Sequence, residues 1–173
     1  GDKENIIAII GDGSLSGGEA LEGLNVAGSE INSNLIIIVN DNEQSIAEVH
    51  GGMYKNLAEL RETGGTASNN LFKAFGLDYI YEENGNDIAS LISLFRKVKD
   101  TDHPIVVHIH TQKGKGYEIA EKDKEGWHWC MPFDRETGKP TISFGDGEDY
   151  TSITAEYIMQ KAKSDSEFLV ITP

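Results

Sequence analysis

The chain has 173 residues, of which 38% are apolar and 25% are charged, and these proportions are ordinary for a globular domain. Its 15 basic and 29 acidic residues give a formal net charge of −14, which disfavours nucleic acid and anionic membranes as partners. Cys130 is the only cysteine, which excludes an internal disulfide, and no apolar run approaches the ~20 residues that a membrane helix needs. Because the net charge repels anions, a phosphate ligand would have to be bound by a local arrangement of residues that overcomes this repulsion.

The two ends of the chain carry apolar segments that are typical of strands. Ile6–Ile10 lies near the first residue of the sequence, and Glu167–Ile171 lies near the last. The opening residues Gly1-Asp2-Lys3-Glu4 do not resemble a signal peptide. We interpret the chain as a fragment of a longer protein, cut at both ends.

Ile6–Ile10 and Leu35–Val39 are continuous apolar runs, a pattern typical of parallel strands that are buried on both faces. Between them the sequence predicts a turn at Gly11–Ser14 and a helix from about Gly17 to Ala27. Asn40-Asp41-Asn42 closes the second strand. This is a β-α-β unit, whose crossover should be right-handed.

Further elements alternate in the same way along the middle of the chain. They are a helix near Tyr54–Arg61, a short helix at Asn69–Phe75, a strand at Asp78–Tyr81, an amphipathic helix at Asp87–Val98 and a strand at Ile105–Ile109. Strands that alternate with helices predict an α/β fold, here a three-layer sandwich around a mainly parallel sheet.

The periodic pattern stops after Thr111. Gln112–Gly147 is polar and rich in glycine, which favours a functional loop followed by an interdomain linker. A helix is expected at Thr151–Ala162, with Thr151 or Ser152 as its cap, and a strand at Glu167–Ile171 would open a second domain.

Two polar motifs follow the first two expected strands. Gly11-Asp12-Gly13 and Asn40-Asp41-Asn42 each stand at a carboxyl end, where open parallel sheets bind ligands. Asp12 and Asn42 offer oxygen atoms that suit Mg²⁺ or Ca²⁺, and the cation would neutralise a diphosphate. Ser14 and the amides at the start of the next helix could donate to phosphate oxygens. A second Gly-Asp-Gly, at residues 145–147, is interpreted as a plain turn.

The paired motifs resemble the cofactor motif of thiamine-diphosphate-dependent enzymes. The longer segments Gly11–Gly28 and Asn40–Ile46 resemble the 1-deoxy-D-xylulose-5-phosphate synthase family, which usually has Met at the position of Gln44. Three later segments continue the resemblance: Thr111–Tyr117, Ala120–Asp123 and Pro132–Asp134.

The resemblance implies a cofactor site. The side chains of Asp12 and Asn42 and the backbone carbonyl of Gln44 would bind Mg²⁺. The resemblance also assigns diphosphate or cofactor contacts to Asn42 and to Gly13, Ser14 and Tyr117. Lys113 would be a cation for phosphate or substrate in the same loop as Tyr117.

His128 matches an active-site histidine of the family, and the neutral pKa of an imidazole would suit proton transfer to the substrate. The alternative is a linker histidine packed between Trp127 and Trp129. His108 and His110 lie on one face of an expected strand, where we expect both to be covered. We expect no functional role for the remaining histidines or the cysteine: His50, His103 and Cys130.

The sequence departs from the family in three places. The segment Gly51–Asn70 is short where the family has a long insertion. Asn84-Gly85-Asn86-Asp87 replaces Asp-Gly-His-Asp, and Trp129-Cys130-Met131 is bulkier than the family's small residues. The family's upstream histidines and its downstream glutamate and arginines fall outside this chain.

The resemblance implies a thiamine-diphosphate-binding fold of the diphosphate (PP) type over residues 1–117. An active-site loop and linker at 118–147 and the start of a pyrimidine-binding domain at 148–173 would follow. The reaction implied is condensation of pyruvate with glyceraldehyde 3-phosphate, which releases CO₂ and gives 1-deoxy-D-xylulose 5-phosphate, a precursor of isoprenoids, thiamine and pyridoxal. The enzyme would be a cytoplasmic homodimer that uses thiamine diphosphate and Mg²⁺.

The chain alone would be inactive, because the activating glutamate belongs to the pyrimidine-binding domain. That domain, the rest of its own chain, is therefore an expected partner. Two alternatives remain open: ketol transfer of the transketolase type by a divergent paralogue, and a non-catalytic half of a split cofactor-binding enzyme.

Overall fold

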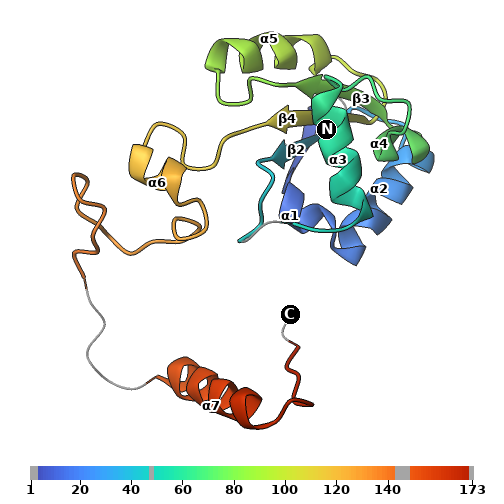
Figure 1. The fold of residues 1–173 in the computed structure, drawn as a ribbon. Helices are drawn as coiled ribbons and strands as arrows, with labels where there is room; N and C mark the ends of the chain where they lie inside the picture. Colours follow the sequence, from blue (N-terminus) through green and yellow to red (C-terminus); the bar gives the residue numbers. More distant parts are fainter. Residues whose placement is uncertain (1–3, 47–48, 143–148, 172–173) are drawn as a thin grey trace. The chain divides into compact units, whose positions relative to one another are not determined.

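The computed structural model describes residues 4–46, 49–142 and 149–171. The chain divides into two compact units, Gly1–Trp129 and Cys130–Pro173. The first unit contains a four-stranded parallel sheet in the order β1-β2-β4-β3 (Figure 1). Its strands are β1 (Ile6–Gly11), β2 (Leu35–Asp41), β3 (Asp78–Glu82) and β4 (Ile105–His110). The strands and their parallel pairing confirm the predicted α/β sheet.

Helices cover both faces of this sheet, which makes three layers. On one face, Leu24, Leu57 and Phe72 bring α2, α3 and α4 into a common core with Val39 of β2. On the other face, Leu94 and Val98 of α5 pack on β2, β3 and β4. The helices of this unit are α1 (Asp12–Leu15), α2 (Gly18–Ser29), α3 (Gly52–Glu62), α4 (Leu71–Ala74), α5 (Ile88–Val98) and α6 (Glu118–Lys122).

The expectation that the first strand is buried on both faces is wrong. Ile7 is 54% exposed and Ile9 is 73% exposed. β1 is the edge strand of the described sheet, and the core beneath α5 is built from the other three strands. The turn expected after β1 is a short helix instead, because Asp12–Leu15 forms α1.

The second unit contains α7 (Tyr150–Ser164) and an isolated antiparallel bridge between Phe133 and Pro140. Asp149 caps α7 by accepting a hydrogen bond from the Ser152 amide at 2.8 Å, so the expectation of Thr151 or Ser152 as the cap is wrong.

The described residues of Glu167–Ile171 form no strand, contrary to expectation. The second Gly-Asp-Gly, at 145–147, lies outside the described residues.

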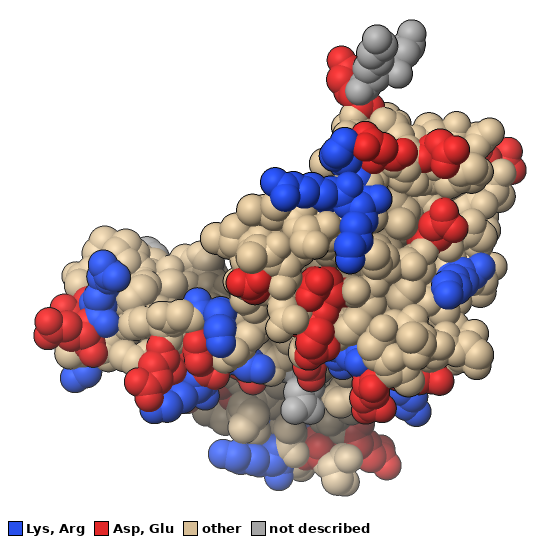
Figure 2. Space-filling view, turned by 90° about the horizontal axis from the view of Figure 1, so that it is seen from above, with Lys and Arg blue, Asp and Glu red and all other residues tan. Residues whose placement is uncertain are grey.

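Lys and Arg side chains lie among Asp and Glu side chains over the face seen in Figure 2. Among the described residues, no helix combines the length and the apolar character that a bilayer crossing requires.

Candidate metal and diphosphate site

Asp12 begins α1 directly after β1 ends, at the carboxyl edge of the sheet. Asp12 is only 2% exposed, and its Oδ2 atom is buried without a hydrogen-bond partner. Burial, and then the charge of Asp41, raise the pKa of the Asp12 carboxyl to about 6. A buried carboxylate oxygen without a donor fits a site that a cation would complete.

The second motif ends at the same edge. β1 and β2 pair in parallel with Gly11 opposite Asn40, so the two motifs follow strands that are neighbours in the sheet. In the loop that follows, the Gln44 amide donates to Asn42 Oδ1 at 3.3 Å, and Gln44 Oε1 is buried without a partner. Across the described ranges, no three acidic, histidine or cysteine side chains form a metal cluster. A cation here would therefore need amide and carbonyl oxygens beside Asp12.

Gly13 lies against this loop. A Cβ atom added at Gly13 would come 2.8 Å from Ser45 Oγ, so a side chain would push the loop away. The Tyr54 hydroxyl of α3 donates to Ser16 Oγ at 2.9 Å, and Ser16 Oγ donates to the Gly13 carbonyl at 3.2 Å. Ser14 is exposed. Tyr54 thus connects α1 and the residue that follows it to α3, a role that its place in the sequence does not signal.

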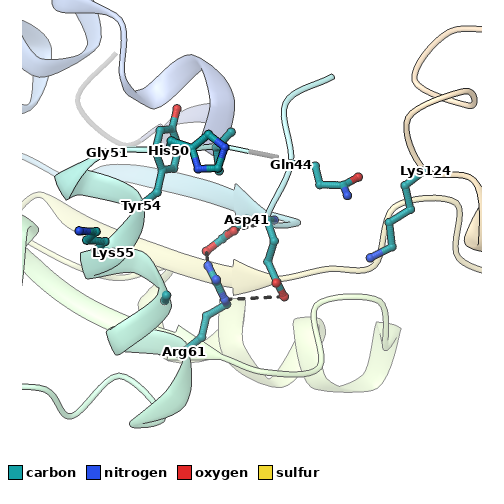
Figure 3. A pocket seen from close by; sticks show the side chains of 11 residues that line it. Asp41, Gln44, His50, Gly51, Tyr54, Lys55, Arg61 and Lys124 are labelled. Carbon is teal, nitrogen blue, oxygen red and sulfur yellow. Dashed lines mark hydrogen bonds and ion pairs between the residues drawn. The ribbon is translucent and has the colours of Figure 1, made fainter. Parts of the chain in front are cut away.

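Asp41, the middle residue of the second motif, lies in a buried network. Its carboxylate forms an ion pair with Arg61 of α3 (Figure 3). It also accepts from His108 Nε2 of β4 at 2.9 Å. Burial opposes ionisation of Asp41, but the hydrogen bond from His108 and the charge of Arg61 outweigh it and lower its pKa to about 2. The covered position of His108 is confirmed, since its side chain is fully buried. The sequence analysis did not identify its partner.

Lys113 connects the loop after β2, which carries Asn42, Gln44 and Ser45, to His128. Its Nζ atom donates to the Ser45 carbonyl at 2.8 Å and lies 2.9 Å from His128 Nδ1. Tyr117 precedes α6, and its ring meets that of Trp127 edge to face with centroids 5.1 Å apart. The structure therefore brings Lys113 and His128 together, whereas Tyr117 is anchored within its own segment.

His110 is not covered as expected. Its ring contacts Glu43 at 2.9 Å and Glu83 at 3.2 Å, and about a quarter of its side chain is exposed. His110 is the last residue of β4, so its side chain reaches acidic groups at the surface.

The segment 84–87 borders the same edge. Asp87 caps α5 through the Ser90 amide, and Asn86 Oδ1 accepts from the Gln112 amide at 2.6 Å. The segment 84–87, together with Glu83 and His110, lines a cavity of about 370 Å³. Asp87 therefore has a structural reason to be an acid, whereas Asn86 holds the loop that carries Lys113.

The parallel sheet, the buried carboxylate that follows β1 and the short helix α1 define an α/β domain with a polar edge at the carboxyl ends of its strands. The chain belongs to the 1-deoxy-D-xylulose-5-phosphate synthase family, because the family model of that description matches residues 1–68 and 63–111.

Individual relatives agree with this assignment. The protein named 1-deoxy-D-xylulose-5-phosphate synthase from Syntrophotalea carbinolica is 35% identical over 206 residues, covering 98% of this chain and 32% of its own. The protein of that name from Listeria monocytogenes is 36% identical over 175 residues, covering 97% of this chain and 29% of its own. The chain thus spans about a third of the length of the curated relatives it matches.

The Syntrophotalea alignment is longer than this chain, so that relative carries residues with no counterpart here. The two stretches of the family match meet at 63–68, just after α3, within the segment 51–70 that the sequence analysis described as short.

Two solved transketolase mutants from Pichia stipitis are each 20% identical to the chain, with TM-scores of 0.48 and 0.49. They match 93% and 92% of this chain and 24% and 23% of their own. These TM-scores are too low to assign a fold, so the fold is assigned from the sheet and its layers alone.

Proposed function

We propose that this chain is the diphosphate- and Mg²⁺-binding part of an enzyme that condenses pyruvate with glyceraldehyde 3-phosphate. The products would be CO₂ and 1-deoxy-D-xylulose 5-phosphate. The observation that carries the proposal is the unpartnered, buried Oδ2 of Asp12, at the edge where both polar motifs end, in a chain of this family.

The proposed cofactor is thiamine diphosphate with Mg²⁺, which when bound supplies the nucleophilic carbon for attack on the keto group of pyruvate. Asp12, the Asn42 side chain and the Gln44 carbonyl would hold the cation. Gly13 lets the backbone lie close to the loop, and the exposed Ser14 hydroxyl is available as a donor to the diphosphate. The cation at this edge would offset the repulsion between a diphosphate and a chain of charge −14.

His128 would transfer or share a proton with the substrate. Because the Lys113 ammonium can only donate, its contact makes His128 Nδ1 an acceptor. A neutral imidazole then carries its proton on Nε2, which is the atom it can present to a substrate hydroxyl or carbonyl. We assign Lys113 to the orientation of this histidine and of the Ser45 loop, and not only to phosphate binding.

The rest of the catalytic site would come from outside this chain. The curated relatives are about three times as long, and we propose that a pyrimidine-binding domain supplies the second wall of the cofactor site. The chain by itself should therefore show no turnover.

Turnover of the whole protein tests the proposal. With pyruvate, glyceraldehyde 3-phosphate, thiamine diphosphate and Mg²⁺, wild type should form deoxyxylulose phosphate. Asp12→Ala should lower kcat/KM by about 100-fold or more, because a cation ligand is lost. His128→Asn should lower it by about 100-fold, the usual contribution of a positioned acid or base. Product is measured by mass spectrometry.

Asp102→Ala is the matched control, since Asp102 is an exposed loop acid whose partner is His103. It should leave turnover unchanged. Equal turnover by wild type and Asp12→Ala would contradict the metal role of Asp12. Cleavage of a ketose donor without use of pyruvate would move the reaction to ketol transfer. Metal-dependent cofactor binding without either product would favour a non-catalytic half of a split enzyme.

A further inference from the structure

Asp41 is an acid that the proposed cation site does not use. Its side chain is 1% exposed, and three elements meet at its carboxylate. Arg61 reaches it from α3, His108 from β4, and the Glu43 amide from the loop after β2, at 3.0 Å from Oδ1. Buried carboxylates persist only when they are paired in this way, so the set is a built arrangement.

The direction of the hydrogen bonds in this network can be assigned. Asp41 Oδ2 accepts from His108 Nε2, so Nδ1 of a neutral His108 accepts from the Tyr79 hydroxyl at 2.8 Å. Burial, and then the charge of Asp41, raise the pKa of the Tyr79 hydroxyl, so it remains a donor. Tyr79 is held in turn by stacking on Phe72 of α4, with ring centroids 5.6 Å apart.

The network ends in the loop that carries the proposed cation ligands. Asp41 is the residue before Asn42, and its Oδ1 binds the amide of the residue after Asn42. Glu43 has a φ of 67°, a left-handed conformation that is strained for a residue with a side chain. The hydrogen bond to Asp41 and the 3.8 Å contact of Glu43 with Arg61 hold that conformation. The path of the loop through Asn42 and Gln44 thus depends on where the Asp41 carboxylate lies.

Asp41 also acts on Asp12 directly. Its charge, after burial, contributes to the raised pKa of Asp12. Arg61 and His108 hold the Asp41 carboxylate on the side of α3 and β4.

We propose that Arg61, Asp41 and His108 form a positioning network that sets the path of the loop through Asn42 and Gln44. The inference rests on the proposed cation-binding role of Asp12 and Asn42. Arg61 and His108 are positioning residues here, since they act on the cation only through Asp41.

The affinity of the whole protein for a divalent cation tests the network independently of catalytic activity. Mn²⁺ serves as the probe, and free Mn²⁺ is followed by electron paramagnetic resonance. Arg61→Met keeps most of the length of the side chain but removes its charge. It should raise the Kd for Mn²⁺ by about tenfold or more, as is usual when a group that holds a metal ligand is lost. Arg61→Lys, which keeps the charge, should restore most of the affinity.

Lys55→Met is the matched control. Lys55 is on the same helix and lines the same cavity of about 480 Å³ as Arg61 (Figure 3). Among the described residues, its ammonium forms no hydrogen bond or ion pair with Asp41. It should leave the Kd unchanged. A purely structural role of Arg61 would lower the melting temperature of Arg61→Met and leave its Kd equal to that of wild type. That result would overturn the inference.

His108 supplies a second pair if Arg61→Met does not fold. His108→Gln retains an N–H that can reach Asp41, whereas His108→Leu does not, so the Leu variant should have the higher Kd. Equal values would overturn the network. A wild-type chain that binds no Mn²⁺ would overturn the cation site and the network together. A failed turnover assay would affect only the proposed reaction.

Discussion

The Asp12 carboxyl is stabilised in its protonated form by the fold, and this leads to a pH-dependent prediction. Its pKa rises from 3.8 to about 6 in the folded chain, through burial and then Asp41. For an acid with a raised pKa, the stabilising contribution is complete below the unfolded pKa and is lost as pH rises through the folded one. The metal-free chain should therefore lose the contribution of Asp12 between about pH 4 and pH 6.

Asp12→Asn removes this titration without changing the size of the side chain. In thermal unfolding without metal, the melting temperature of Asp12→Asn should increasingly exceed that of wild type as the pH rises from 4 to 7. Added Mg²⁺ should raise the melting temperature of wild type at pH 7 but not that of the variant, because ligand binding stabilises the state that binds it. Parallel pH curves for the two proteins would contradict a raised pKa.

The sequence predicts single residues unevenly. Asp12 and Asn42 stand at strand ends in a fixed pattern, so their shared edge could be predicted before strand order was known. The partners of Asp41 could not be, because His108 is 67 positions away and Arg61 is 20. Their meeting depends on β2 lying beside β4 and under α3. The one available signal is His108 itself, an ionisable residue within the apolar run of β4, which needs a polar partner.

Among the elements, α2 and the turn after α4 meet backbone to backbone. A Cβ atom at Gly28 would lie 1.9 Å from the Phe75 carbonyl oxygen, and Gly76, with a φ of 90°, lies against Gly28. Gly28→Ala should therefore lower the free energy of unfolding by about 2 kcal/mol or more, since the neighbour is backbone and cannot turn away.

Gly23→Ala tests the same change on the same helix where no atom lies within 4 Å of the added Cβ. It should raise the free energy of unfolding by about 0.5–1 kcal/mol, because alanine favours the helix. Denaturant unfolding of the two variants beside wild type measures both changes. Similar effects of the two substitutions would contradict the close packing at Gly28.

The longer elements follow from periodicity, whereas two of the short helices do not. α5 and the four strands of the sheet lie within a residue or two of their predicted bounds, because apolar spacing is clear over five or more residues. α1 and α6 have four and five residues, too few to show a period. Asp149, just before α7, was overlooked as a cap in favour of the residues after it.

At the scale of the whole molecule, one edge of the sheet is open. Ile7 and Ile9 of β1 lie on the α5 face, beyond the core that α5 covers, and Ile6 is exposed as well. Continuous apolar residues predicted burial correctly for β2 but not for β1, since the sequence of a strand does not reveal its place in the sheet. An exposed apolar edge strand is a site of self-association.

A matched pair of substitutions tests this edge. Ile9 and Ile38 are register partners, but Ile9 is 73% exposed and Ile38 is 7% exposed. Ile9→Lys should change the free energy of unfolding by no more than about 0.5 kcal/mol and should reduce self-association of the chain. Ile38→Lys buries a charge without a partner and should lower the free energy of unfolding by more than about 3 kcal/mol.

Denaturant unfolding measures the stability of each variant, and light scattering over a range of chain concentrations measures self-association. If Ile9→Lys were as damaging as Ile38→Lys, another surface would have to cover Ile9 in solution, most simply β1 of a second copy of the chain. A Lys at position 9 would then lower stability in proportion to the fraction of chain that is associated. The concentration dependence of unfolding therefore distinguishes an edge that is open from one that is already paired.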